Sequence, residues 1–508
     1  MTAIVNSLKK TTGDAVVYGF GNIAVKIVGF ILLPLYTNPE YFSVNDFGVI
    51  AILDITGMVL LAFMASGLTQ SLMRWYWDKD HSGNQKGIFF MSLTTQSVIS
   101  ILFCLLLFPF SRQLSTVIFS TAEWNNTIKL LILSSALQAI NNIIIALMRL
   151  QSKSVLYSVT NIAKLLIVLS LTIYLIVFRN MGIKGIYLAQ VTGNFLFIAA
   201  VSVYTLKNCR IYYNRSIFFS MSRYGYPILL ANIAATTLTV IDRYSLNSLT
   251  LLKYVAIYAL AYKISSVLRL VIVDSVKMAV MPAALKKMNY PGNKRFYSKT
   301  LLYSSYVLTF GMIGLSLFSY EIIKLITGSK EYWSSFYIVP LLSLSVFFTN
   351  MREMSSWGLI IAKKTRIIGM DAVVAALINI LLNILLIPLW DITGAAVATI
   401  YTQFSYWLLN YYFSQKEYHV PYEIRKLAIL FVLGGALSFS GLLMTGMDLI
   451  PRLLLKTACL TGFPFLLYLF NFYEPVELQS IKGFITKWSN LKKFRENLSS
   501  LKELTNNS

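Results

Sequence analysis

Residues 366–414 are the strongest indication of the fold, and they read RIIGMDAVVAALINILLNILLIPLWDITGAAVATIYTQFSYWLLNYYFS. They divide into two apolar segments, 366–389 and 392–414, and each is long enough to cross the hydrocarbon layer of a membrane, which takes about 20 residues. Pro388 is expected to end the first helix. Because hydrocarbon offers no water to exposed backbone groups, both segments are predicted to be helices.

The rest of the chain repeats this pattern. Of its 508 residues, 56% are hydrophobic and 13% are charged, and the mean hydropathy is +0.65. This composition excludes a soluble globular protein with a polar surface. The sequence therefore predicts an all-α polytopic membrane protein with about 14 transmembrane helices, near residues 14–36, 47–70, 87–110, 125–148, 155–178, 183–206, 220–241, 253–280, 300–326, 334–361, 366–389, 392–414, 426–446 and 451–472.

The formal net charge of +23 is a guide to topology. Most lysines and arginines fall in short loops on one side of the predicted map, the side that also holds both termini. Cytoplasmic loops of membrane proteins carry this excess, so both termini are predicted to be cytoplasmic and no nucleic-acid partner is expected. The polar, basic N-terminus has no small-residue cleavage site before the first span, so no cleaved signal peptide is expected.

Short motifs recur at offsets of a little over 200 residues. The pairs are Tyr18-Gly19 with Tyr224-Gly225, Phe47-Gly48-Val49-Ile50-Ala51 with Tyr254-Val255-Ala256-Ile257-Tyr258, and Ile183-Lys184-Gly185 with Ile392-Thr393-Gly394. Apolar helices repeat such residues by chance, but the constant order favours two parallel six-helix lobes around a central cavity. The expected division is 1–210 for the N-lobe, 211–417 for the C-lobe, 418–475 for an added helical hairpin and 476–508 for a basic amphipathic tail. The tail is expected to lie on the anionic leaflet or to dock a partner helix.

Several predicted spans hold a cation deep inside the apolar segment. They are Lys26, Lys164, Lys263, Arg269 and Arg352. A charge in hydrocarbon is costly, so these residues are predicted to bind a negative group that crosses the membrane, or else to form structural ion pairs. Lys26 lies about 18 Å along the first helix, too deep to reach either end easily. Two acids lie near Arg352: Glu353 is its neighbour in the sequence, and Asp371, near the same side of the eleventh span, is a candidate partner for it.

The eighth span carries the most charge. At 100° per residue, Lys263, Asp274 and Lys277 share one face, while Arg269 points about 120° away from Lys263. Lys277 is interpreted as reaching the membrane surface, which leaves Lys263 and Arg269 as candidate ligands of a phosphate group.

Two acidic residues, Asp54 and Asp242, lie in or next to predicted spans. Asp54 in the second span is either a site that couples transport to a proton or sodium gradient, or a paired and hydrated carboxylate. Asp242-Arg243, placed at an outer helix end, is interpreted as a surface pair.

Motifs of enzymes are missing from the sequence. It has no P-loop, no Gly-x-Ser-x-Gly and no His-Glu-x-x-His, and its three cysteines lack the spacing of metal ligands. The prediction is a transporter that is not an enzyme and has no cofactor. An ion gradient, the membrane potential or consumption of the product would drive it.

Two groups of motifs are similar to those of a known family. The first consists of Tyr18-Gly19, Pro34-Leu35-Tyr36-Thr37, Phe47-Gly48-Val49, Gly67-Leu68 and Arg74-Trp75-Tyr76. The second is the run from Ile378 to Pro388, followed by Gly394-Ala395-Ala396-Val397-Ala398-Thr399. In order and spacing they resemble the polysaccharide flippases of the multidrug/oligosaccharidyl-lipid/polysaccharide superfamily.

This resemblance implies a Wzx-like flippase of O-antigen or capsule units in the bacterial inner membrane. Such a protein moves an undecaprenyl-diphosphate-linked oligosaccharide to the periplasmic leaflet. Membrane lipids, a polysaccharide polymerase and glycosyltransferases would be its partners. Cations in the first and eighth helices are a family theme, matched here by Lys26 and by Lys263 or Arg269, although lipid II flippases tend to carry Arg in the first helix. In those relatives the last two helices help to form a groove for the lipid tail.

Two other functions compete with this one. A cation-coupled multidrug or metabolite exporter of the same superfamily would favour an acidic cavity, whereas cations outnumber acids in the predicted spans. A polytopic glycosyltransferase or polymerase would carry large loops with catalytic acids, whereas all loops here are short.

Overall fold

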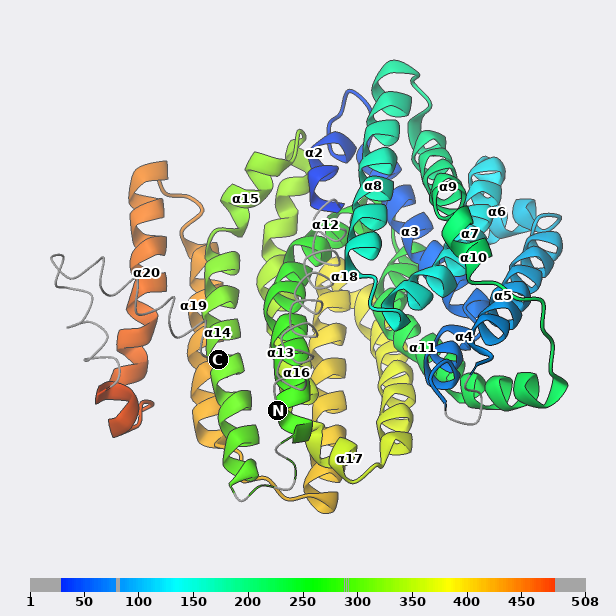
Figure 1. The fold of residues 1–508 in the computed structure, drawn as a ribbon. Coiled ribbons are helices and arrows are strands. Elements are labelled where there is room, and N and C mark those ends of the chain that lie inside the picture. Colours follow the sequence, from blue (N-terminus) through cyan, green and yellow to red (C-terminus); the bar gives the residue numbers. More distant parts are fainter. Residues whose placement is uncertain (1–28, 79–82, 287, 289, 291, 480–508) are drawn as a thin grey trace, which may run out of the picture.

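The computed structural model describes residues 29–78, 83–286, 288, 290 and 292–479, and the regular elements of these residues are all helices (Figure 1). The first half contains α2 (Leu33–Tyr36), α3 (Val44–Met64), α4 (Leu68–Trp75), α5 (Gln85–Leu107), α6 (Ser111–Phe119), α7 (Asn125–Leu150), α8 (Ser154–Ile173), the π-helical η2 (Tyr174–Phe178), α9 (Gly182–Ala200) and α10 (Ser202–Lys207). The second half contains α11 (Arg215–Leu249), α12 (Leu252–Leu268), the π-helical η3 (Arg269–Asp274), α13 (Ser275–Lys286), α14 (Asn293–Leu317), α15 (Ser319–Ile326), the 3₁₀-helical η4 (Lys330–Tyr337), α16 (Ile338–Ser355), α17 (Trp357–Ile361), α18 (Thr365–Glu417), α19 (Ile424–Leu443) and α20 (Leu449–Leu469).

The number of helices confirms the predicted fold class. Twelve helices of the described residues are long and apolar enough to span a membrane. One of them, α18, supplies two passes. Most of the first predicted span lies outside the described residues, and only its final part, including α2, is seen. The predicted tail lies almost entirely outside them as well.

The segment quoted first, 366–414, forms a helical hairpin within α18. Its backbone leaves the helical conformation at Trp390 and at Asp391, where φ is 47°. Asn379 Nδ2, before the break, donates a hydrogen bond to Thr402 Oγ1, after it, at 3.2 Å. This contact shows that the chain reverses its direction at the break. The two predicted spans and the turn between them are therefore confirmed.

The two halves use a similar pattern of helix packing. In the first half α5 packs on α7 and α7 on α9, and in the second α14 packs on α16 and α16 on α18. Figure 1 shows the first half, blue to teal, on the right and the second half, green to yellow, in the centre. The helices α3, α12 and α16 are mostly buried, whereas α5, α8 and α20 are mostly not, as expected for helices that face lipid. The buried helices therefore form the centre of the bundle.

The halves touch each other closely at two levels. Near the start of α3, a Cβ on Gly48 would lie only 2.3 Å from the carbonyl oxygen of Leu252 at the start of α12. At the start of α4, a Cβ on Gly67 would lie 2.2 Å from the carbonyl oxygen of Gly225 in α11, and the φ of Gly67 is 69°. Only glycine allows this approach and this conformation together. The lobes are thus in backbone contact above and below the region between them.

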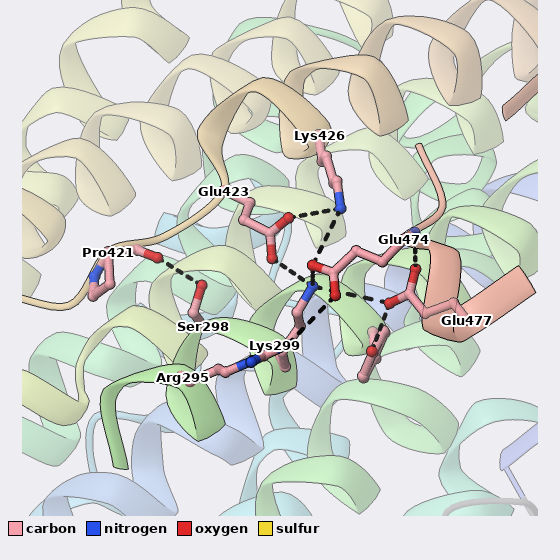
Figure 2. A network of polar contacts seen from close by, with 9 residues as sticks. Arg295, Ser298, Lys299, Pro421, Glu423, Lys426, Glu474 and Glu477 are labelled. Carbon is pink, nitrogen blue, oxygen red and sulfur yellow. Dashed lines mark hydrogen bonds and ion pairs between the residues drawn. The ribbon is translucent and has the colours of Figure 1, made fainter. Parts of the chain in front are cut away.

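The last two helices, α19 and α20, are tied to the body by ions at both ends. At one end, Glu321 accepts from Lys456 Nζ at 2.7 Å and contacts Arg452 Nε at 2.8 Å. At the other end, the C-terminal ion cluster joins the start of α14, the start of α19 and the segment after α20 (Figure 2). Its members are Arg295, Lys299, Lys426, Glu423, Glu474 and Glu477. These contacts fix the predicted hairpin at the edge of the bundle.

Candidate functional site

Three adjoining cavities lie inside the bundle. The N-lobe cavity, about 800 Å³, is lined by α3, α7, α8 and α9. The central cavity, about 520 Å³, lies between α3, α4 and α7 of the first half and α11 and Arg269 of the second. The C-lobe cavity, about 220 Å³, is lined by α11, α12, α16 and α18, together with Arg269 at the start of η3. Arg149 lines the first two cavities and Arg269 the last two, so each of these arginines lies where two cavities adjoin.

The wall of the N-lobe cavity is rich in neutral amides around one lysine. Lys164 Nζ on α8 donates to Gln138 Oε1 at 2.8 Å and to Asn194 Oδ1 at 3.0 Å. Asn194 is held in turn, because its Nδ2 donates to Ser134 Oγ at 3.2 Å. Within the part of the chain that the structure describes, no carboxylate lies within ion-pair distance of Lys164. The predicted ligand Lys164 therefore faces a cavity with its charge uncompensated.

Arg149, near the end of α7, is a cavity residue that the sequence interpretation missed. Its Nη2 donates to the hydroxyl of Tyr157 at 3.0 Å, and its guanidinium lies 5.1 Å from the centre of that ring. Arg149 is one residue beyond the predicted span 125–148, so the sequence interpretation counted it among the loop cations that indicate topology. The final turn of α7 instead points it at the junction of the N-lobe and central cavities.

The C-lobe cavity holds two of the predicted cations, and both are paired. Arg352 Nη2 lies 2.5 Å from Glu353 Oε1, and Lys277 Nζ lies 2.6 Å from Glu353 Oε2. Of the two acids that the sequence places near Arg352, Glu353 forms the ion pair, and the suggested pairing with Asp371 was wrong. Lys277, interpreted from the sequence as reaching the membrane surface, also pairs with Glu353, so that Glu353 contacts two cations. The other predicted cation, Arg269, lies 4.0 Å from Asp274 Oδ1.

A π-helical segment explains why the predicted faces of the eighth span do not hold. The arithmetic of 100° per residue assumes an unbroken α-helix, but η3 covers Arg269–Asp274. In a π-helix the hydrogen bonds run between residues five apart, which is the spacing of Arg269 and Asp274. The segment therefore brings them together and places Arg269 at the meeting point of two cavities.

Lys263 and Asp54 lie across the junction of the two halves. Lys263 Nζ on α12 is 3.9 Å from Asp54 Oδ2 on α3 and 5.4 Å from the centre of the Phe47 ring. Asp54 also accepts a hydrogen bond from the hydroxyl of Tyr187 at 3.2 Å, and it lines the N-lobe cavity. Lys263 is thus placed as the partner of Asp54. Lys26 lies outside the described residues.

Asp242 and Arg243 are buried, so their interpretation as a surface pair was wrong. Asp242 is 3% exposed and accepts from the hydroxyls of Tyr258 and Thr399 and from Asn383 Nδ2, at 2.7 to 2.9 Å. The error came from the span boundary, predicted at 241, because α11 continues to Leu249. The described residues contain no group of three or more His, Cys, Asp or Glu side chains suited to a metal ion.

Comparison with known proteins identifies relatives at two levels. Residues 41–337, more than half of the chain, match the family described as polysaccharide biosynthesis protein. No protein of curated function matches the chain in sequence.

Solved structures show which fold this is. The lipid II flippase MurJ in an inward closed conformation is similar at a TM-score of 0.73 and 16% identity, over 89% of this chain and 99% of that one. An inward-facing multidrug resistance MATE family transporter of the MOP superfamily gives 0.64 and 12%, over 81% and 98%. The Vibrio cholerae MATE transporter VcmN in the bent form gives 0.54 and 13%, over 85% and 100%. At these identities the likeness concerns the fold.

Proposed function

Because the chain belongs to the family of polysaccharide biosynthesis proteins and has the fold shared by MurJ and MATE transporters, we propose that it is a flippase for a lipid-linked oligosaccharide. The substrate is an oligosaccharide joined through a diphosphate to undecaprenol, and it moves from the cytoplasmic to the periplasmic leaflet of the bacterial inner membrane. Both termini are cytoplasmic in this proposal. Glycosyltransferases would supply the substrate and a polymerase would use it to build an O-antigen or capsule.

The observation that carries the proposal is a pair of arginines, one from each half of the chain, that both line the central cavity. Arg149 belongs to the first half and Arg269 to the second. A guanidinium group is flat and presents several N–H donors, which suits the oxygens of a phosphate. A diphosphate held by both arginines would bind to both lobes at once, as alternating access around a fixed site requires.

The remaining lining fits the other parts of such a lipid. Asparagine, glutamine, serine and threonine side chains line all three cavities or their junctions, and their amides and hydroxyls pair with sugar hydroxyls. The prenyl chain can remain in the membrane, since it needs no polar contact. The fold alone also fits a multidrug exporter. The central cavity, however, is lined by Arg149 and Arg269 and by no carboxylate among the described residues, and these arginines would repel a cationic drug.

Asp54 and Lys263 provide the proposed coupling to an ion gradient. They form an ion pair between α3 of one half and α12 of the other. Neutralising Asp54 by a proton, or screening it with sodium, would remove an attraction that holds the halves together. Such a step would make the change between the two open states depend on the gradient.

The test is flipping by the purified protein in vesicles. A fluorescent undecaprenyl-diphosphate disaccharide is incorporated, and the fraction protected from dithionite is measured with time. Wild-type protein should bring the labelled lipid of the inner leaflet to the outer leaflet, where dithionite quenches it. The double variant Arg149→Gln/Arg269→Gln should leave that lipid protected. Arg112→Gln on the exposed surface of α6 is the matched control and should behave as wild type. If vesicles with wild-type protein protected as much lipid as vesicles without protein, the proposal would be contradicted. Export of a cationic dye by the vesicles with wild-type protein would support the multidrug exporter.

A further inference from the structure

We propose that the N-lobe cavity recognises a carboxylate on a sugar of the transported unit, and that Lys164 is the residue that selects it. This inference rests on the proposed function and adds the chemical class of the glycan. The cavity has room for this role, because about 800 Å³ lies within the range of sites that enclose small ligands.

The position of the cavity makes it the place for the sugars. Asn142, Ile145 and Arg149 line both the N-lobe cavity and the central cavity. The N-lobe cavity is therefore next to a diphosphate bound at Arg149 and Arg269, and we place the sugars of the ligand in it. The C-lobe cavity, about 220 Å³, is much smaller. The glycan is thus directed toward Lys164.

The amides around Lys164 suit sugar hydroxyls. Gln138, Asn142, Asn161, Gln190 and Asn194 all line this cavity. Each amide has two N–H donors and one carbonyl acceptor, and a hydroxyl group both donates and accepts, so the two chemistries match in either direction. This set alone would bind neutral and acidic sugars equally well.

Lys164 adds a preference for one negative charge. Its ammonium group has three N–H donors, of which two are used by the neutral oxygens of Gln138 and Asn194. The ammonium also lies 5.4 Å from the centre of the Phe197 ring, but no carboxylate among the described residues neutralises it, so one donor and a net positive charge remain for a ligand. A compact point charge with one free donor suits a single carboxylate oxygen, whereas a phosphate group with more charge and more oxygens is better held by arginines.

The other charged groups of this cavity do not cancel that preference. Asp54 lies in the same wall, but it is paired with Lys263 at 3.9 Å and accepts a hydrogen bond from Tyr187. Arg149 sits at the junction with the central cavity and contacts the hydroxyl of Tyr157. Lys164 is also held rigidly, because Asn194 is bonded to Ser134 on α7. A site that is already in place loses little freedom on binding.

The test uses two lipids that differ by one methyl group. One is an undecaprenyl-diphosphate disaccharide that ends in a uronic acid, and the other is its neutral methyl ester. Binding of each to the protein in nanodiscs is measured by titration. Wild-type protein should bind the acid about 10- to 100-fold more tightly than the ester, as expected for one charge-assisted hydrogen bond.

Variants separate the parts of the inference. Lys164→Gln should reduce the preference for the acid to less than about threefold and leave the affinity for the ester nearly unchanged, whereas Lys164→Arg should retain most of the preference. Lys184→Gln, on the exposed face of α9, is the matched control. Equal binding of acid and ester by wild-type protein would overturn the inference but not the proposed function. Binding of neither lipid would overturn both.

Discussion

The N-lobe and C-lobe cavities contain similar cations in opposite circumstances. In the C-lobe cavity, Arg352 lies 2.5 Å from the carboxylate of Glu353, which also pairs with Lys277, and Arg269 lies 4.0 Å from Asp274. In the N-lobe cavity, Lys164 is bonded only to the amide oxygens of Gln138 and Asn194 among the described residues. A carboxylate partner cancels most of the field of a cation, whereas an amide leaves it available. Burial of a cation therefore does not by itself mark a ligand site, and the identity of its partner decides.

The largest expected effect tests whether the paired cations stabilise the fold. Glu353→Gln would leave Arg352, 13% exposed, without a carboxylate. Breaking a buried ion pair from one side costs roughly 3–5 kcal/mol. Lys164→Gln removes a charge that has no carboxylate partner and should change stability by less than about 1 kcal/mol. Thermal unfolding in detergent measures both variants. Equal losses of stability in Glu353→Gln and Lys164→Gln would show that the paired cations of the C-lobe cavity do not stabilise the fold more than Lys164 does.

The second effect concerns the rate of transport. Here a cation without a carboxylate partner should matter more than a paired cation. Arg149→Gln removes a cation whose described contacts are a hydroxyl and an aromatic ring. If it holds the diphosphate, flipping should slow about 10- to 100-fold, the equivalent of one or two charge-assisted hydrogen bonds. Stability should hardly change. Initial rates in vesicles give the result, with Arg112→Gln as the control. A normal rate would remove Arg149 from the site.

The sequence was sufficient for the spans and insufficient for the partners of the cations. The hydropathy of residues 366–414 predicted a hairpin correctly, because crossing a membrane requires a fixed length of apolar helix. Local sequence also placed Glu353 beside Arg352. The link to Lys277 was not predictable, since Lys277 and Glu353 are 76 positions apart and meet only in the folded chain.

Other residues were misplaced for reasons that are local and physical. Arg149 looked like a loop marker because it is near the end of a span, yet the last turn of a helix can still line a cavity. Asp242 looked exposed because hydropathy falls near 241, while α11 continues for two more turns. The faces of the eighth span depended on an unbroken α-helix, which η3 interrupts. Hydropathy detects the span and not its register.

A third and smaller effect is expected at the ion pair between the halves. Asp54→Asn removes the partner of Lys263, but the two groups are 3.9 Å apart and partly exposed to the cavity, so the stability should fall by about 1 kcal/mol or less. The informative measurement is flipping with and without an imposed proton or sodium gradient. Wild-type rates should depend on one of these gradients and those of Asp54→Asn should not. Asp448→Asn, exposed before α20, is the control. Equal gradient dependence in wild type and Asp54→Asn would exclude the coupling role.

The smallest effect is expected outside the cavities, at the C-terminal ion cluster of Figure 2. It tests whether cations paired with carboxylates stabilise the fold there as well. The hydrogen bond from Lys299 is the main reason why the pKa of Glu474 is below its ordinary value of 4.5. Burial acts to raise the pKa of Glu423, but hydrogen bonds from Lys299 and Lys426 outweigh it and lower that pKa as well. A carboxyl group with a lowered pKa stabilises the fold above its ordinary pKa, and the contribution is lost as the pH falls through the lowered value.

Stability from this cluster should therefore be constant from pH 7 to about 5 and decline below about 4.5. The measurement is the unfolding midpoint of wild type and Glu474→Gln at pH 7 and at pH 3.5, with Glu40→Gln as an exposed control. The Glu474→Gln variant should be less stable than wild type at pH 7 by less than about 1 kcal/mol, since these groups are partly exposed, and the difference should shrink at pH 3.5. A difference that grows on acidification would mean that Lys299 does not lower the pKa of Glu474. It would also weaken the view that closely paired cations such as Arg352 stabilise the fold and leave ligand binding to Lys164, Arg149 and Arg269.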